Sequence, residues 1–139
     1  MSGWTPDELD KIDAPDEIDI AALQPDGSLR PFRIIWVVRV GDDLYVRSVL
    51  GRDSAWFRAV LRRPEGRIRA GEVEYDVAFE ESANADHAAI DEAYGRKYAR
   101  YDRADVDAIV DPTARVATLR LLPHRDTAGV SGTSDQSKT

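Results

Sequence analysis

The sequence contains no cysteine, which excludes disulfides, thiolate nucleophiles and cysteine-ligated zinc or iron–sulfur sites. Histidine is scarce as well, and His87 and His124 are far apart and lack the spacing of metal ligands. No window has the apolar length of a membrane span, and no signal peptide precedes Trp4. These absences predict a cytoplasmic protein without a metal site or a membrane association.

What the chain does contain is enough for one domain with its own core. It has 139 residues, of which 42% are hydrophobic and 32% are charged. We expect a single domain over residues 1–123, followed by a disordered tail over 124–139, where glycine, serine, threonine and aspartate replace apolar residues. The formal net charge of −7 argues against nucleic acid as a partner, because a nucleic-acid-binding protein needs a positive surface.

Short strands joined by tight turns dominate the pattern. Thr5 and Glu8 form a capping box that starts a helix, and Ser54 can cap another. The predicted fold is mainly β with α, an antiparallel six-stranded split β-barrel with peripheral helices. We expect helices over residues 6–12, 55–63, 85–102 and 104–110, and strands over residues 17–24, 33–40, 44–49, 67–70, 72–79 and 115–122.

Residues 33–40 form the strongest predicted strand. Its even positions are all apolar, and Ile35 and Val37 make its middle apolar on the other face too, as in a barrel wall or a subunit interface. Trp36 lies in this alternation and so fits the core or an interface, with stacking on a ligand ring as the alternative. The tyrosines at 94, 98 and 101 have helical spacing, which favours packing within the protein.

Arginine is concentrated in one stretch. Residues 30–70 hold ten arginines and four acidic residues, a formal charge of +6 within the acidic chain. Arginine provides a planar fork that suits phosphate and carboxylate groups. We expect an acidic protein that gathers its arginines in one stretch to place them on one surface. Together with the aromatic residues of this stretch, that surface would suit a flat, phosphorylated ligand. The alternative is that these arginines solvate the surface while their stems cover apolar area.

A candidate anion site follows the strand that ends near residue 48. Arg47 and Ser48 precede a glycine, and Ser54 then caps the next helix, whose free N–H groups and positive dipole end favour an anion. Arg58 lies one turn into that helix. Arg47 and Ser48 point to opposite faces of a regular strand, so both can hold one phosphate only if the chain turns there. The alternative is an ordinary corner in which Ser54 only caps the helix.

Several motifs together resemble a small, mostly bacterial family of unknown function over residues 4–123, and more distantly the split-barrel flavin-binding superfamily. That superfamily includes pyridoxamine-phosphate oxidase-like proteins and deazaflavin-dependent nitroreductases. The motifs are Asp26-Gly27-Ser28-Leu29-Arg30-Pro31, Ile35-Trp36-Val37-Val38, Gly41-Asp42-Asp43-Leu44-Tyr45-Val46-Arg47-Ser48 and Trp56-Phe57-Arg58.

The resemblance implies a homodimer that binds FMN or a deazaflavin coenzyme in a groove at the dimer interface. The cofactor-binding residues that it implies are Arg47, Ser48 and Arg58, with Arg52 and Trp56 beside them and Trp36 on the strand along the ring. Ser54 joins this set as the cap of the candidate anion site. The strand that holds Ile34, Ile35 and Trp36 would lie along the ring system. Many relatives place a lysine in the helix where this chain has Trp56 and Arg58, which leaves FMN, the deazaflavin coenzyme, another ligand or none open.

No nucleophile-and-base arrangement and no glycine-rich phosphate loop occur in the sequence, so its catalytic residues are unknown. If the protein is an enzyme, a cofactor must carry the chemistry. We therefore expect a flavin- or deazaflavin-binding protein that acts as an oxidoreductase on small molecules. The alternative is a non-catalytic binding or interaction module that keeps the barrel without a redox cofactor.

Overall fold

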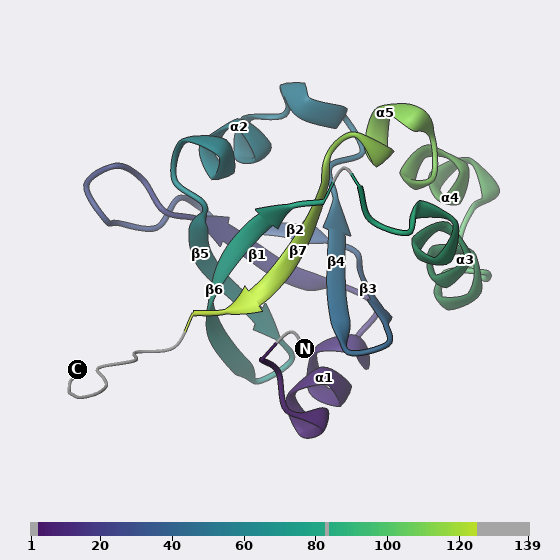
Figure 1. Ribbon diagram of the computed structural model, residues 1–139, viewed down its shortest axis with the longest axis horizontal. Helices are drawn as coiled ribbons and strands as arrows, with labels where there is room; N and C mark the ends of the chain where they lie inside the picture. Colours follow the sequence, from purple (N-terminus) through teal and green to yellow (C-terminus); the bar gives the residue numbers. More distant parts are fainter. Residues whose placement is uncertain (1–2, 83, 125–139) are drawn as a thin grey trace.

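The computed structural model describes residues 3–82 and 84–124. Its centre is one antiparallel sheet of seven strands in the order β2-β1-β5-β6-β7-β4-β3, nearly closed into a barrel, with helices at its two ends and along one side (Figure 1). The α+β barrel class predicted from the sequence is therefore confirmed. The strands are β1 (Ile18–Ala22), β2 (Arg33–Ile35), β3 (Val37–Val40), β4 (Asp43–Arg47), β5 (Glu65–Ala70), β6 (Val73–Glu81) and β7 (Thr118–Pro123). The helices are α1 (Pro6–Asp13), α2 (Ala55–Arg62), α3 (His87–Lys97), α4 (Arg103–Ile109) and α5 (Pro112–Arg115), with a 3₁₀ turn at Gly51–Asp53.

The predicted single strand over residues 33–40 is two strands, which makes the sheet seven-stranded rather than six-stranded. The chain changes partner at Trp36: Ile35 pairs with Ile18 of β1, whereas Val37 pairs with Val46 of β4. β2 and β3 stand at opposite ends of the strand order, so the continuous chain between them joins the two edges of the sheet. The bend at Trp36 thus closes the barrel covalently.

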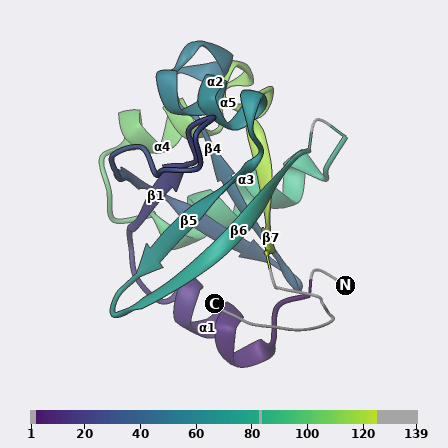
Figure 2. The ribbon, with the colours of Figure 1, turned by 90° about the vertical axis from the view of Figure 1, so that its left-hand side faces the viewer.

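The inner face of the sheet forms the main core. Alternate residues of the strands point inward, so Leu44 and Val46 of β4 and Leu119 and Leu121 of β7 are completely buried. Helices α1 and α2 lie at opposite ends of the barrel in both views (Figure 2). Each contributes apolar side chains to the same core, including Leu9 and Ile12 of α1 and Phe57, Ala59 and Val60 of α2.

A second apolar cluster lies outside the barrel wall. There α3 and α4 pack on the outer face of β3 and β4, with Ile90 and Tyr94 of α3, and Tyr98 directly after it, in one cluster with Val38 of β3. The Tyr94 and Tyr98 side chains are fully buried, as their helical spacing predicts. This cluster fixes α3 and α4 beside the strand that ends in Arg47, and so it forms one side of the site described below.

The helix starts agree with their predicted caps. Thr5 and Glu8 form the capping box of α1, and the Ser54 side chain accepts a hydrogen bond from the Phe57 N–H at the start of α2. The predicted helix over residues 85–102 is shorter, because α3 ends at Lys97 and the chain turns before α4. Apart from His124, the predicted disordered tail lies outside the described residues. No helix within 3–82 and 84–124 has the length and apolar character needed to cross a bilayer.

Candidate functional site

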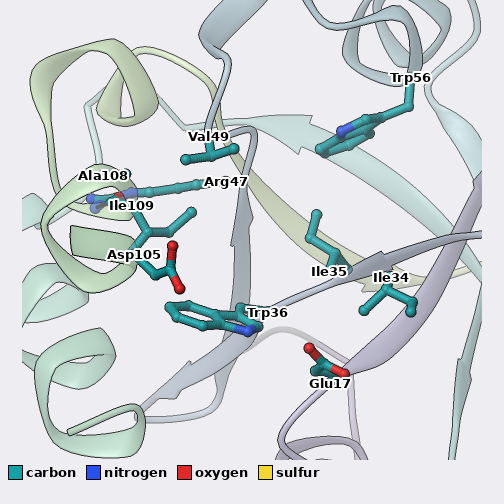
Figure 3. Close-up of a pocket in the computed structure, with 10 residues that line it drawn as sticks. All are labelled: Glu17, Ile34, Ile35, Trp36, Arg47, Val49, Trp56, Asp105, Ala108 and Ile109. Atoms are coloured by element: carbon teal, nitrogen blue, oxygen red, sulfur yellow. Dashed lines mark hydrogen bonds between the residues drawn. The ribbon is translucent and has the colours of Figure 1, made fainter. Parts of the chain in front are cut away.

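A groove of about 270 Å³ opens beside the bend at Trp36 (Figure 3). It lies between β2 with the bend at Trp36, the end of β4 and the residues after it, α2 and α4. Its described lining contains no hydroxyl, thiol, imidazole or amine, so the groove can bind a ligand but supplies no nucleophile of these types. The lining residues are Glu17, Ile34, Ile35, Trp36, Arg47, Val49, Trp56, Asp105, Ala108 and Ile109.

Trp36 is held rigidly at one end of this groove. Its indole stacks on the Tyr98 ring, with the ring centroids 4.0 Å apart and the planes 5° from parallel, and it meets the edge of Tyr101. The Val37 N–H donates to the Tyr98 hydroxyl (3.1 Å), which in turn donates to the Asp16 carbonyl (2.7 Å). Burial raises the pKa of Tyr98, so its hydroxyl keeps the proton that this second bond requires. Trp36 is therefore both a packing residue and part of the groove wall.

Lys97 supports the same bend from α3. Its ammonium donates to the Val37 carbonyl (2.8 Å) and pairs with Asp13 (3.1 Å). Burial lowers the pKa of Lys97, and the Asp13 carboxylate opposes that change. The backbone groups at the strand break are thus bonded to side chains instead of to a neighbouring strand, which satisfies them where the sheet is interrupted.

Trp56 borders the other end of the groove, and apolar side chains surround its mouth. Figure 3 shows Ile35 between the two tryptophans, Ile34 next to it on the same strand, and Val49 across the groove. Ile34 is 68% exposed and Val49 is 47% exposed, although both are large and apolar. Leu50, next to Val49 in the chain, is 70% exposed. We call Ile34, Val49 and Leu50 the apolar rim; exposed groups of this kind commonly mark a ligand or partner surface.

Arg47 lies at the inner side of the groove, where it is 1% exposed. Its guanidinium donates to Thr118 Oγ1 (3.0 Å), Asp91 Oδ1 (2.6 Å) and the Ile109 carbonyl (3.1 Å). The remaining nitrogen, Arg47 Nη2, lies 3.1 Å from His87 Nδ1. Because arginine can only donate, His87 Nδ1 accepts this hydrogen bond. Arg47 thereby ties β4 to β7, α3 and α4. Asp91 also pairs with Arg115, so this buried group of charges is not anionic.

Ser48 and Ser54 do not reach Arg47. Their hydroxyls bond each other at 2.8 Å, and Ser54 also accepts the Phe57 N–H at 3.3 Å. Both serines are buried. Arg47 and Ser48 point to opposite faces of the wall, as strand parity requires, so the structure does not bring them together around one anion. This is the corner in which Ser54 caps the helix.

The other arginines of the stretch 30–70 do not form one surface, because five of these nine are paired with acids on different elements of the fold. Arg52 pairs with Glu81 and donates to the Val116 carbonyl. The same holds for Arg39 with Asp10, Arg67 with Asp76 and Arg69 with Asp19, while Arg63 pairs with nearby Glu65. Arg58 is exposed and has no ion pair within the described residues. The convergence expected from the sequence is therefore wrong: more than half of these arginines are held in separate ion pairs, and they do not gather around one anion.

Two carboxylates at the groove were not predicted. Glu17, just before β1, and Asp105, in α4, are exposed and line the groove on either side of Trp36 (Figure 3). Neither has a cationic partner within the part of the chain that the structure describes. In the sequence each is one acid among 26, and only the fold brings the two beside the same indole.

Comparison with known proteins places this sequence in a family. A family model described as "Uncharacterized protein conserved in bacteria (DUF2255)" matches residues 8–121, which is most of the chain. No curated protein matches the sequence.

Solved structures share the fold at low sequence identity. HutZ, the heme storage protein from Vibrio cholerae, matches with a TM-score of 0.58 and 12% identity, over 86% of this chain and 90% of that one. A candidate pyridoxamine 5′-phosphate oxidase from Listeria innocua matches with a TM-score of 0.57 and 12% identity, over 84% and 90%. A FAD-binding protein from Mesorhizobium loti matches with a TM-score of 0.50 and 16% identity, over 88% and 91%. At identities this low, the structural similarity establishes the fold alone. The fold agrees with the split barrel predicted from the sequence.

Proposed function

The chain belongs to the bacterial DUF2255 family, and we propose that its groove binds the ring system of a flavin or deazaflavin for small-molecule redox. The observation that carries the proposal is the groove between Trp36 and Trp56, which has an apolar wall that includes Ile34 and Ile35. A planar, weakly polar ring suits such a slot. Proteins that share the fold include one that binds FAD, which makes the flavin class the first to test.

The residues present fit the ring, and they support a different position for the phosphate from the one expected. All the donor nitrogens of Arg47 already have acceptors, so Arg47 has little left for a ligand anion. Arg33, next to Ile34 in the chain, and Arg58, two residues after Trp56, are exposed and have no ion pair within residues 3–82 and 84–124. Neither arginine lines the groove itself, but both lie close in the chain to residues that do, so they are the candidate contacts for a phosphate that extends beyond it.

The protein's own contribution would be binding, orientation and exclusion of water. A bound flavin supplies hydride and electron transfer, for which no side-chain nucleophile is needed. Trp36, fixed by Tyr98, would form a rigid boundary at one end of the ring's slot. The apolar rim would keep water from one of its edges.

The test is titration of the purified chain with FMN, riboflavin and a deazaflavin coenzyme, followed by flavin fluorescence and calorimetry. Saturable binding of at least one of them is expected. FMN and riboflavin share the ring and differ in the phosphate, so the double variant Arg33→Ala/Arg58→Ala should weaken FMN about tenfold and leave riboflavin unchanged. Arg96→Ala/Arg103→Ala removes two exposed arginines from α3 and α4 and serves as the charge-matched control. A folded chain that binds none of the three ligands would end the proposal.

A second candidate is a binding or interaction module without a redox cofactor, and the paired arginines favour it. Arg47 and Arg52 are both bonded to acids of the same chain, which is how a purely structural arginine behaves. In that case neither the wild-type chain nor the Arg33→Ala/Arg58→Ala variant would bind a flavin. The variant would instead differ from the wild type in its affinity for a protein partner.

The expected homodimer is also part of the proposal. The apolar rim is the surface that a second copy would cover, and covering it would enclose the groove. Replacing Leu50 with aspartate should shift the chain to monomer in analytical ultracentrifugation. Leu61→Asp, a change at a 38% exposed leucine on α2, is the comparison.

A further inference from the structure

The Trp36 end of the groove carries negative charge that nothing in the described chain neutralises. Glu17 reaches it from the segment before β1 and Asp105 from α4 (Figure 3). The Asp105 carboxylate points toward the space over the indole, and Glu17 lies beyond the opposite edge of the ring. The two side chains come from elements far apart in the sequence, so their meeting at one indole is a property of the fold.

The neighbouring acids behave differently, which makes these two notable. Asp13 and Asp16, close to Glu17, pair with Lys97 and Arg100. Asp107, close to Asp105, pairs with Arg103. Cations therefore lie near both groove acids, but they pair with the neighbouring acids instead.

Arg47 does not cancel this charge. Its guanidinium is buried, and its own partners are Asp91, Thr118, the Ile109 carbonyl and His87. Asp105 and Glu17 are exposed instead at the open side. The inner side of the groove thus holds a cation that is already paired, whereas its open side near Trp36 holds two carboxylates without a cationic partner within the described residues.

Trp36 adds a second attraction for positive charge. Tyr98 covers one face of the indole, so the ring presents its remaining surface to the groove, where the π-electrons attract cations. An aromatic face flanked by carboxylates is chemically suited to an ammonium or a pyridinium group. The same arrangement disfavours an anion at this end.

We propose that the second ligand of this groove, the substrate that would lie beside the flavin ring, is a cation of the organic amine or pyridinium class. This inference rests on the proposed function only for the statement that a flavin ring lies beside the cation. The preference of the groove for a cation can be measured without a flavin. The overall charge of −7 would add long-range attraction for the same ligands.

Three small ring compounds of similar size test the preference: 1-methylnicotinamide, a cation; nicotinamide, which is neutral; and nicotinate, an anion. Calorimetric titration is done on the chain with and without saturating riboflavin. The expected order of affinity is cation, neutral, anion, with the cation about five- to tenfold tighter than the neutral compound. Raising the salt concentration should weaken the cation alone.

The double variant Glu17→Gln/Asp105→Asn should remove that advantage and leave nicotinamide binding within about twofold, because the side chains keep their shape and lose their charge. Glu72→Gln, in the exposed turn between β5 and β6, is the control and should change nothing. Equal affinities for the three compounds in the wild-type chain would overturn the inference, as would an equal loss in the control variant.

The two proposals fail separately. Riboflavin binding without cation preference refutes the substrate class and leaves the cofactor proposal standing. Cation preference without binding of any flavin removes the cofactor proposal and leaves a groove selective for organic cations.

Discussion

Replacing Arg47 with alanine should destabilise the fold more than any other single arginine change in the stretch 30–70. The side chain is 0% exposed and donates to groups on β7, α3 and α4. Breaking a buried ion pair by removing one partner costs about 3–5 kcal/mol, because the remaining charge and acceptors lose their partner. Asp91 is 18% exposed and keeps Arg115, which places the expected loss at about 3 kcal/mol, near the lower end of that range.

The assay is urea unfolding at neutral pH, followed by tryptophan fluorescence and circular dichroism. A loss of about 3 kcal/mol corresponds to a fall in Tm of roughly 10 °C for a domain of this size. Arg58→Ala is the matched control, since Arg58 is exposed and unpaired within the described residues, and it should cost less than about 0.5 kcal/mol.

A double-mutant cycle then separates pairing from packing. Asp91→Asn keeps the size of the side chain and removes its charge, so the two single changes should be strongly non-additive if the pair is coupled. An Arg47→Ala variant that loses less than about 1 kcal/mol would refute the reasoning. If that variant also lost riboflavin binding, Arg47 would have to be reassigned from holding the fold to holding the ligand.

Two further predictions concern backbone and pH. Gly51 has φ +75°, and a Cβ at this position would lie 2.8 Å from Thr113 Cγ2. Gly41 has φ +64°, and a Cβ there would meet no atom within 4 Å. Gly51→Ala should therefore lower the free energy of unfolding in urea by about 1–3 kcal/mol more than Gly41→Ala does. Burial raises the pKa of Tyr94 above its usual value of 10.0, so the unfolded chain ionises first and stability falls as the pH rises above that value. Tyr94→Phe should leave stability at neutral pH within about 1 kcal/mol and make this alkaline loss shallower, as measured by urea midpoints on both sides of pH 10. An identical slope in the two proteins would contradict the assignment.

Local signals predicted the elements well, and the break at Trp36 shows their limit. Thr5 and Ser54 cap their helices because capping depends on residues a few positions away. Residues 33–40 read as one strand because the alternation continues through Trp36 without a glycine or proline. What ends β2 there is a change of hydrogen-bonding partner from β1 to β4, fixed by Tyr98 and Lys97 from α3. Such contacts across the chain leave no mark at position 36 itself.

The site was harder to predict for the same reason. The apolar wall of Ile34, Ile35 and Trp36 was expected beside a ring, and these residues do line one groove with Trp56. The arginines were expected to converge, but local sequence cannot reveal an ion-pair partner that lies tens of residues away, such as Asp91 for Arg47. Glu17 and Asp105 carried no signal at all, since free and paired acids look alike in a sequence.

The arginines that remain unpaired suggest how one groove could hold two ligands of opposite charge. Arg30, Arg33, Arg58 and Arg62 have no ion pair within the described residues, and all four lie on β2, the approach to it, or α2. Those elements carry Ile34 and Trp56, whereas the free acids flank Trp36. A phosphate tail would be drawn toward the first region and a cation toward the second, with the ring between them. If Arg33→Ala/Arg58→Ala weakened 1-methylnicotinamide as much as FMN, the two regions would not be separate and this division of the groove would be wrong.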